Sequence, residues 1–366
     1  MSGALVDLVA KGVQDVYLTG KPEVSFFKQN YKRHTNFSMT NARLNPMGSG
    51  LEHTIKIVNK GDLLNYVWID LGSSATVGSA AVAANTESPA VFELWIGGQM
   101  IDRQDAFFMV QLWQKFLVDS GSKTMALVND DDDSTSGSQL LGAKWMPLHF
   151  LFCDSYYLPL VALQYNEVEI RIKYAASTNV SDFKYYANYI VLDTAERDFF
   201  VNNDHEILIE QVQKITSEGS ATAPKFSLSL LNHPVKCILW GGPDNTTTLT
   251  TGDVQIYLNG TELFESPMPD KYFTQVQGYY HSEYGSELLK GAAGTSGTGG
   301  RLKMYSFAMK ANRHQPCGTC NFSRLDNAEM LIGSVAGSVP SNFHLYAVNY
   351  NILRIKKGMA GVAFSN

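Results

Sequence analysis

The pattern that most constrains the fold is a long series of short β-rich runs, each ended by turn-forming residues. Val, Ile, Leu, Tyr, Phe and Trp predominate in these runs, and Gly, Pro, Asn, Asp and Ser separate them at short intervals. With so few helical stretches, the pattern predicts an all-β protein built as a sandwich or barrel. The predicted strands include residues 53–58, 63–71, 90–96, 145–152, 158–163, 168–174, 207–215, 226–231, 235–242, 254–260, 302–310, 330–335 and 346–355.

Two landmarks recur in the chain at nearly the same spacing. Trp95 to Gly98 and Tyr257 to Gly260 each run from a strand into a hairpin turn, and they lie 162 residues apart. Tyr165 to Ile170 aligns with Leu325 to Met330 at an offset of 160 residues. Such turns are common in β proteins, so coincidence is the alternative, but the shared offset favours a duplicated domain. A unit of about 160–170 residues fits a jelly roll of roughly eight strands.

Two segments have the spacing of an amphipathic helix. Residues 4–17 predict a short helix, and we leave two roles open for it: packing on its own domain, or acting as an arm that docks on a neighbour. Residues 105–119 predict a helix inserted between strands, and residues 271–280 are its counterpart in the second copy. Three tryptophans in strand or helix runs are expected in the core rather than at an interface: Trp95, Trp113 and Trp240.

The charge balance of the chain is acidic. A net charge of −6 at pH 7 and a sequence pI of about 5.8 argue against a broad nucleic-acid-binding face, because neutralising phosphates requires clustered Lys and Arg. The basic, aromatic stretch at residues 25–37 is therefore interpreted as a solvated strand edge. The run Asp130 to Asp133 lacks the Gly and the distant Glu of an EF-hand and is interpreted as a solvated loop tip.

The residues that carry metal or catalytic chemistry do not form a recognisable set. None of the eight histidines makes the His-x-His pair of a metal-binding jelly-roll enzyme. Cys317 and Cys320 form a single CxxC near His314, but structural zinc needs four ligands, and Cys153 and Cys237 lie far away in the sequence. Motifs for nucleophilic, zinc-dependent or nucleotide-dependent catalysis are absent from the sequence. We predict four free thiols and no catalytic residue, cofactor or metal.

The sequence also indicates where the chain resides. Charges at Asp7, Lys11 and Asp15 interrupt the continuous apolar run that a signal peptide requires, and no window is apolar enough for a membrane span. Four cysteines in 366 residues do not make a disulfide framework, which favours a reducing compartment. Five N-x-S/T sequons are expected to be unused: Asn36, Asn179, Asn245, Asn259 and Asn321.

The stretch from His314 to Glu329, HQPCGTCNFSRLDNAE, passes from a Pro/Gly loop into a strand. It closely resembles a signature of the major capsid proteins of nucleocytoplasmic large DNA viruses. Cys317 departs from that signature, where a small polar residue is expected, and the loops are short for the family. Other stretches resemble the same family in the family's order, so that the resemblance covers nearly the whole chain: residues 9–37, 146–152, 158–170, 192–200, 205–213, 231–242, 306–330 and 345–366.

This resemblance implies an all-β fold of two tandem eight-stranded jelly rolls, a double jelly roll, with short inserted helices. It implies an N-terminal arm at residues 1–24, a first jelly roll at 25–197 and a second at 198–366. The short loops argue against a heavily decorated or glycosylated outer surface.

The function implied by the resemblance is that of a major capsid protein without catalysis. Homotrimers would form pseudo-hexagonal capsomers that tile the icosahedral shell of a large double-stranded DNA virus. Expected partners are other copies of the chain, and minor capsid proteins and inner membrane-associated proteins at the inner face, without direct nucleic-acid binding. The expected location is the virion, after synthesis and assembly in the host cytoplasm. Two alternatives are a minor capsid paralogue of the same fold and a carbohydrate-binding β-sandwich.

Overall fold

The structure is a computed structural model. It describes residues 9–29, 31–86, 88–120, 123, 126–127, 139–152, 156–220, 223–241, 252–282, 302–333 and 344–364. Tertiary contacts divide the chain into two units, residues 1–36 and residues 37–366. None of the helices within the described ranges is long and apolar enough to cross a membrane.

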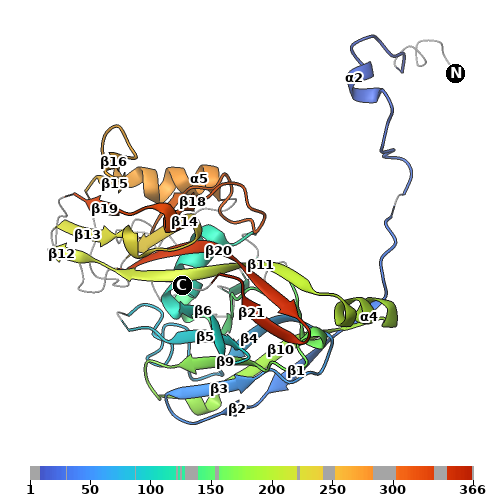
Figure 1. Ribbon diagram of the computed structural model, residues 1–366, viewed down its shortest axis with the longest axis horizontal. Helices are drawn as coiled ribbons and strands as arrows, with labels where there is room; N and C mark the ends of the chain where they lie inside the picture. Colours follow the sequence, from blue (N-terminus) through green and yellow to red (C-terminus); the bar gives the residue numbers. More distant parts are fainter. Residues whose placement is uncertain are drawn as a thin grey trace. The chain divides into compact units, whose positions relative to one another are not determined.

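The first half of the larger unit is a sandwich of two antiparallel sheets (Figure 1). Sheet A has the order β1 (Phe37–Leu44), β10 (Lys184–Leu192), β4 (Leu63–Asp70) and β7 (Trp145–Pro147), with β8 (Leu158–Pro159) also on β4. Sheet B has the order β2 (Pro46–Met47), β3 (Glu52–Lys56), β9 (Val168–Lys173), β5 (Val91–Ile96) and β6 (Gln99–Asp105). Inward residues of both sheets form one apolar core, among them Val67, Ile69, Phe92, Leu94 and Ile170.

The second half repeats this arrangement. Sheet C has the order β11 (His205–Thr216), β20 (His344–Lys356), β14 (Pro234–Gly241) and β17 (Lys303–Ser306), with β18 (Cys320–Asn321) on β14 and β21 (Met359–Val362) on β20. Sheet D has the order β12 (Glu218–Ser220), β13 (Ala223–Ser227), β19 (Ala328–Ile332), β15 (Val254–Leu258) and β16 (Thr261–Glu262). Since β2 and β12 continue β1 and β11 into the facing sheet, each half has the four-plus-four order of a jelly roll. The predicted double jelly roll is confirmed.

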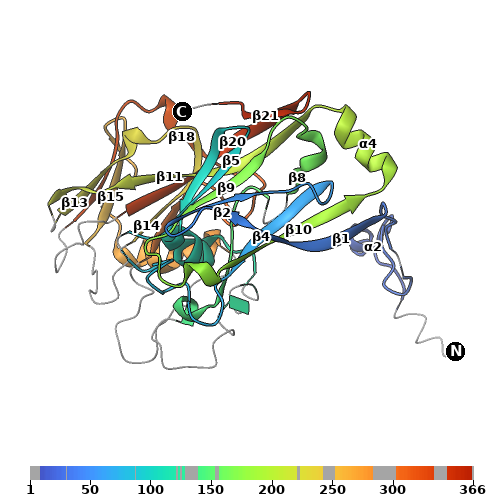
Figure 2. The same cartoon turned by 90° about the horizontal axis from the view of Figure 1, so that it is seen from below.

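The helices between the strands are short. In the first half the helices with described bounds are η1 (Phe108–Leu117), η2 (Gln139–Gly142), η3 (Leu160–Ala162) and η4 (Val180–Asp182), and residues 123, 126 and 127 are also helical. In the second half they are η5 (Leu228–Leu230), η6 (Tyr272–Val276), α5 (Gln277–His281) and η9 (Phe322–Arg324). Helix α4 (Thr194–Asn202) joins β10 to β11, and therefore links the two halves (Figure 2).

Equivalent strands of the two halves pair in the same register. Two cross-strand pairs of sheet B have counterparts in sheet D at the predicted offsets of 162 residues on one strand and 160 on the other. They are Trp95 opposite Glu169 and Leu94 opposite Ile170 in sheet B, and Tyr257 opposite Glu329 and Ile256 opposite Met330 in sheet D. The register therefore matches the duplication that was expected from the sequence.

The strand register of sheet A also corresponds to that of sheet C, and both sheets contain a β-bulge at the equivalent position. In each sheet the register between the two central strands shifts at the same place, which leaves one residue bulged: Asn65 in sheet A and Lys236 in sheet C. The pairs beside the two bulges correspond. They are Asn188 opposite Tyr66 and Tyr186 opposite Trp68 in sheet A, and Val348 opposite Cys237 and Tyr346 opposite Leu239 in sheet C.

The three tryptophans expected in the core do not all lie there. Trp240 is completely buried in the second core, and Trp113 is half-buried against the first. Trp95 lies on the outer face of sheet B, with the guanidinium of Arg171 4.1 Å from its ring centre. The reason is the two-residue period of β5, which directs its alternate residues Phe92, Leu94 and Ile96 inward.

The helix expected at residues 105–119 is present, but it is a π-helix and not the α-helix that the sequence pattern predicts. Residues 108–117 form the π-helix η1, whose side chains are buried on more than one side because it lies between the two halves. All residues of η1 except Trp113 are buried. The 3.6-residue periodicity therefore located the helix correctly without predicting its geometry.

Residues 1–36 were partly mispredicted. Residues 9–15 form turns and irregular structure, and α2 (Val16–Thr19) is the only helix among residues 9–29. The helix expected at 4–17 is therefore wrong for residues 9–15, and residues 4–8 lie outside the described residues. The described residues of 25–36 form no strand edge. Within this unit Tyr17, Phe26 and Phe27 are almost fully exposed. Residues 130–133, interpreted as a loop tip, also lie outside the described residues.

The two equivalent hairpins turn through residues with positive φ. Gly97 and Gly98 have φ values of 58° and 81°, and Asn259 and Gly260 have 50° and 78°. Two consecutive residues of this kind are typical of a type I′ turn, which matches the twist of the strands it joins. A Cβ at Gly98 or at Gly260 would meet no atom within 4 Å, whereas one at Gly97 would collide with the side chain of Asn166.

We therefore expect Gly98→Ala and Gly260→Ala to lower the free energy of unfolding by the same amount, about 1–2 kcal/mol, from backbone strain alone. Gly97→Ala should cost more because it adds the collision with Asn166. Denaturant titration of the three variants measures this. A large difference between Gly98→Ala and Gly260→Ala would contradict the equivalence of the hairpins.

Candidate functional site

The main apolar contact between the described parts of the two sandwiches is a junction where β6 and η1 of the first half lie on the outer face of sheet C (Figure 1). Tyr346 occupies the centre of this contact. Its ring lies 6.0 Å from that of Phe107 and 5.5 Å from that of Phe108, and its hydroxyl donates to Asp105 Oδ2 at 2.8 Å. Outer-face residues of sheet C therefore belong to the core of the first sandwich: Cys237, Leu239, Met304, Tyr346 and Val348.

Asp105 connects three elements at this junction. Its Oδ1 accepts the backbone N–H of Phe108 at 2.9 Å, which satisfies an amide at the start of η1. Its Oδ2 lies 2.8 Å from Lys214 Nζ on β11 and also accepts the hydroxyl of Tyr346. Burial and the neighbouring Asp105 raise the pKa of Tyr346 well above its ordinary value, so its hydroxyl keeps the proton that it donates.

Asp102 is the second buried carboxyl group of β6. It accepts the backbone N–H of Val212 on β11 at 3.0 Å, that of Arg103 at 2.9 Å and the side-chain amide of Gln104 at 2.6 Å. Burial raises the pKa of Asp102 to about 6 in spite of these donors. Its charge at neutral pH is therefore held by hydrogen bonds from both halves.

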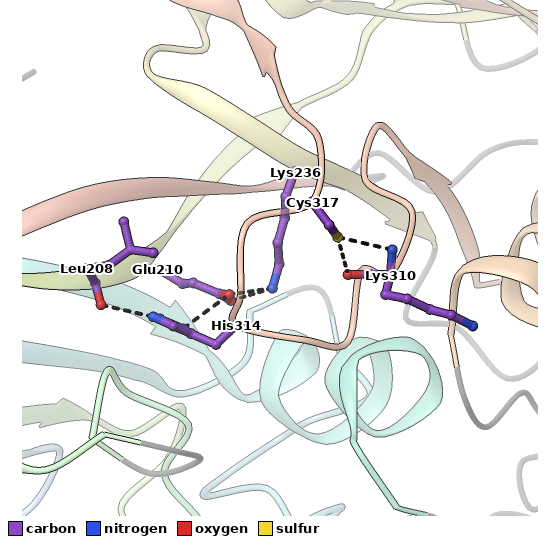
Figure 3. Close-up of polar contacts among 6 residues, drawn as sticks. All are labelled: Leu208, Glu210, Lys236, Lys310, His314 and Cys317. Atoms are coloured by element: carbon purple, nitrogen blue, oxygen red, sulfur yellow. Dashed lines mark hydrogen bonds and ion pairs between the residues drawn. The ribbon is translucent and has the colours of Figure 1, made fainter. Parts of the chain in front are cut away.

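The signature stretch forms a loop over a buried charge cluster at the edge of the junction (Figure 3). Lys236, the bulged residue of β14, places its Nζ 2.6 Å from both carboxylate oxygens of Glu210 on β11. His314 lies beside the pair: Nε2 donates to the carbonyl oxygen of Leu208 at 3.0 Å, and Nδ1 lies 3.4 Å from Glu210 Oε1. Burial alone would raise the pKa of Glu210, but Lys236 and His314 outweigh it and lower that pKa.

The thiol of Cys317 forms two hydrogen bonds to the backbone of Lys310 within the same loop. The thiol lies 3.4 Å from the carbonyl oxygen of Lys310, to which it donates, and 3.3 Å from the Lys310 backbone nitrogen, from which it accepts (Figure 3). Cys237 lies in β14, where burial raises the pKa of its thiol to about 12. Cys317, Cys320 and Cys237 are unpaired, and Cys153 lies outside the described residues.

A small cavity of about 60 Å³, lined by both polar and apolar side chains, lies behind the charge cluster, between the two halves. The ring of Tyr156, from the first half, lies 4.2 Å from that of His314 at its rim. Among the described residues, Gln104 Oε1 and both amide atoms of Asn312 have no hydrogen-bond partner there. The cavity has the size and polarity to hold a few water molecules that satisfy these groups.

This arrangement positions two domains and offers no reaction chemistry. Across the described parts of the chain, no three His, Cys, Asp or Glu side chains gather closely enough to hold a metal ion. The loop containing His314 and Cys317 was singled out from the sequence, but its partners were not. Asp102, Asp105 and Glu210 lie in polar-looking runs, and the only available signal was Lys236, a charge inside the apolar run VKCILW.

The fold and junction thus define a structural protein of the double jelly-roll class, and comparisons place it within that class. A family model described as "Large eukaryotic DNA virus major capsid protein" matches residues 196–361, and one described as "Major capsid protein N-terminus" matches residues 25–202. The major capsid proteins of Pyramimonas orientalis virus and Paramecium bursaria Chlorella virus 1 are 34% and 30% identical to the chain, with both partners of each comparison covered in full.

A solved structure agrees with this grouping. A chain titled "PBCV-1 virus capsid, quasi-atomic model" superposes with a TM-score of 0.74 and 25% identity, over 93% of this chain and 100% of that one. The chain belongs to the family of major capsid proteins of large eukaryotic DNA viruses. Its role is structural and not enzymatic: it is a component of the virion and assembles with itself into the capsid.

The charge cluster makes a testable contribution to stability. Glu210→Gln keeps the shape of the side chain but leaves Lys236 buried without a counter-charge, so we expect the free energy of unfolding to fall by about 3–5 kcal/mol. Glu167→Gln is the matched control, because its 2.6 Å pair with Lys56 is exposed and should contribute nothing measurable. Denaturant titration of both variants measures the two losses of unfolding free energy. Equal losses would contradict the prediction that the buried pair contributes more to stability than the exposed pair.

The effect of Glu210→Gln on the free energy of unfolding should depend on pH in a defined direction. The pKa of Glu210 in the folded protein lies below its ordinary value of 4.5, so its stabilisation is present above that pH and is lost as the pH falls through the folded pKa. The stability difference between the wild-type chain and Glu210→Gln should therefore shrink as the pH is lowered below 4.5.

Proposed function

We propose that this chain is a homotrimeric capsomer subunit whose trimers have a pseudo-hexagonal outline and tile an icosahedral shell. The observation that carries the proposal is the presence, in one chain, of two sandwiches with the same strand order and register. Three such chains supply six similar wedges, which pack hexagonally with nearly equivalent contacts. Threefold symmetry makes the trimer a closed unit, and weaker contacts between trimers then build the lattice.

We propose the domain boundaries 1–24 for an N-terminal arm, 25–197 for the first jelly roll and 198–366 for the second. Supporting this division, the strands of sheets A and B lie within residues 37–192 and those of sheets C and D within residues 205–362. The boundary at 197/198 falls within α4, the connection between the halves.

The partners beyond the chain itself are proposed from the family and from charge. Minor capsid proteins and inner membrane-associated proteins would contact the inner face, where we place the arm because of its exposed aromatic residues. A net charge of −6 supports a shell that does not bind the genome directly. Assembly takes place in the host cytoplasm, with all four thiols free and without a bound metal, cofactor or catalytic group.

Native mass spectrometry tests the trimer. A trimer stable to moderate salt should have three times the chain mass of 40.4 kDa and resist dilution to micromolar concentration, because an obligate interface of roughly 2,000 Å² or more leaves little free subunit. Negative-stain images of the same sample should have a hexagonal outline. A well-folded monomer that persists at micromolar concentration would defeat the proposal.

Deletion of residues 1–20 tests the arm. Because these residues belong to the unit separate from residues 37–366, the truncated chain should fold and trimerise normally. Assembly of trimers into shells should be impaired, as measured by light scattering and electron microscopy. Unfolding of the jelly rolls in the truncated chain would instead make the segment an ordinary part of the core.

A further inference from the structure

Three hydrogen-bonded side chains, the His53–Tyr185–Tyr174 chain, cross the core of the first sandwich. His53 lies on the inner face of β3 in sheet B, and Tyr185 lies on the inner face of β10 in sheet A. His53 Nδ1 lies 2.7 Å from the hydroxyl oxygen of Tyr185, and the hydroxyl of Tyr174, the residue after β9, lies 2.8 Å from the same oxygen. Polar groups therefore link the two sheets inside an otherwise apolar core.

Water hardly reaches these three side chains. His53 is 6% exposed, Tyr174 is 2% exposed and Tyr185 is completely buried. The rings pack edge-on, with the ring centre of His53 5.5 Å from that of Tyr174 and 6.0 Å from that of Tyr185. Phe183 packs on Tyr174 at 5.3 Å and closes the cluster. Because the surroundings are apolar, the three groups depend on one another for their hydrogen bonds.

The two hydroxyl protons define the charge of the imidazole. When Tyr174 donates to Tyr185 and Tyr185 donates to His53 Nδ1, both protons are used within the chain. In the reverse order the proton of Tyr174 would leave the chain and enter the apolar core, so we assign the first order. Nδ1 is then an acceptor, which requires a neutral imidazole, because both nitrogens of an imidazolium are donors.

The groups packed against His53 cannot compensate an added proton. The titratable groups that face it are the two phenols, and Phe183 and the cross-strand residue Ile172 are apolar. Burial raises the pKa of Tyr185 to about 12 and that of Tyr174 well above its ordinary value, so both stay neutral. Burial lowers the pKa of His53 below its ordinary value of 6.5, and among the described residues no carboxylate contributes to that shift.

The second sandwich does not repeat this chain. By the register of β13 with β19, Pro224 takes the place of His53, and Leu345 takes the place of Tyr185 in β20. Neither side chain titrates. The equivalent of Tyr174, residue 334, lies outside the described residues. The duplicated fold therefore carries this polar link between its sheets in the first half, at positions where the second half has apolar residues.

We propose that the His53–Tyr185–Tyr174 chain makes the first sandwich acid-sensitive, because uptake of a proton by His53 breaks the link between sheets A and B. Below pH 6.5 the unfolded chain binds a proton at this histidine, whereas the folded chain resists it down to its own lower pKa. The stabilisation is therefore fully present above pH 6.5 and is lost as the pH falls.

For a shell subunit, this element gives a capsomer that is firm at neutral pH and opens more readily in acid. The inference goes beyond the proposed trimer and does not rest on it, since the chain of hydrogen bonds lies within one sandwich.

Amide hydrogen exchange, measured by mass spectrometry and corrected for the intrinsic effect of pH, tests the proposal. Between about pH 7 and about pH 5.5 the opening constant of β3, β9 and β10 should rise about threefold or more, with a limit of about tenfold per pH unit. His53→Asn offers Tyr185 an amide oxygen in place of Nδ1 and does not titrate, so the rise should disappear. His205→Asn, at a partly exposed position in β11, is the matched control and should leave the rise unchanged.

Two results would overturn the proposal. One is a rise in β3, β9 and β10 that persists in His53→Asn. The other is a rise that depends on His53 but is equally large in β13 and β19, since the proton would then act on the whole chain rather than on the first sandwich.

Exchange at the C2 carbon of histidine provides a measurement on the wild-type chain, because its dependence on pH gives the pKa of each histidine. His53 should titrate below 6.5, and in Tyr185→Phe its pKa should rise, because the donor to the neutral imidazole is lost. A wild-type pKa at or above 6.5 would overturn the proposal even if His53→Asn failed to fold.

Discussion

The structure depends on the contact of β6 and η1 with the outer face of sheet C. Without it, Leu239, Tyr346 and Val348 would face water. The same contact satisfies the buried carboxyl groups of Asp102 and Asp105, since each of them accepts a hydrogen bond from the other half. Because buried charges are costly unless their partners are well placed, these groups favour one relative orientation of the halves. The two sandwiches thus form one compact unit, which suits a subunit that repeats many times in a shell.

The duplication explains why such a wedge assembles further. A contact between two unlike surfaces leaves one copy of each unsatisfied at the ends of a pair, and such head-to-tail contacts form a ring when the rotation closes. On the described surface, Trp68 and Tyr186 stack on the outer face of sheet A, and Tyr279 and Tyr280 of α5 are exposed. The proposed trimer would bring six such sandwiches together in one closed unit.

Much of the fold could be predicted from the sequence, because its signals are local. The Gly97-Gly98 and Asn259-Gly260 turns require positive φ, and their spacing placed the two hairpins at equivalent positions. The junction could not be predicted in this way. Asp105 meets Lys214 across 109 residues and Tyr346 across 241, and a lone Asp or Lys in a sequence looks the same whether it is exposed or buried. Trp95 shows the same limitation: its place in a strand run suggested the core, but the alternation of side chains along β5 directs it to the outer face.

An experimental density map of the purified capsomer tests the central claim most directly. The measurement is the superposition of two pairs of sandwiches, the pair within one chain and the pair formed between neighbouring chains. The account predicts that the two pairs superpose, with each sandwich turned by close to a sixth of a turn from the last. A capsomer in which the pair within a chain and the pair between chains do not superpose would contradict it.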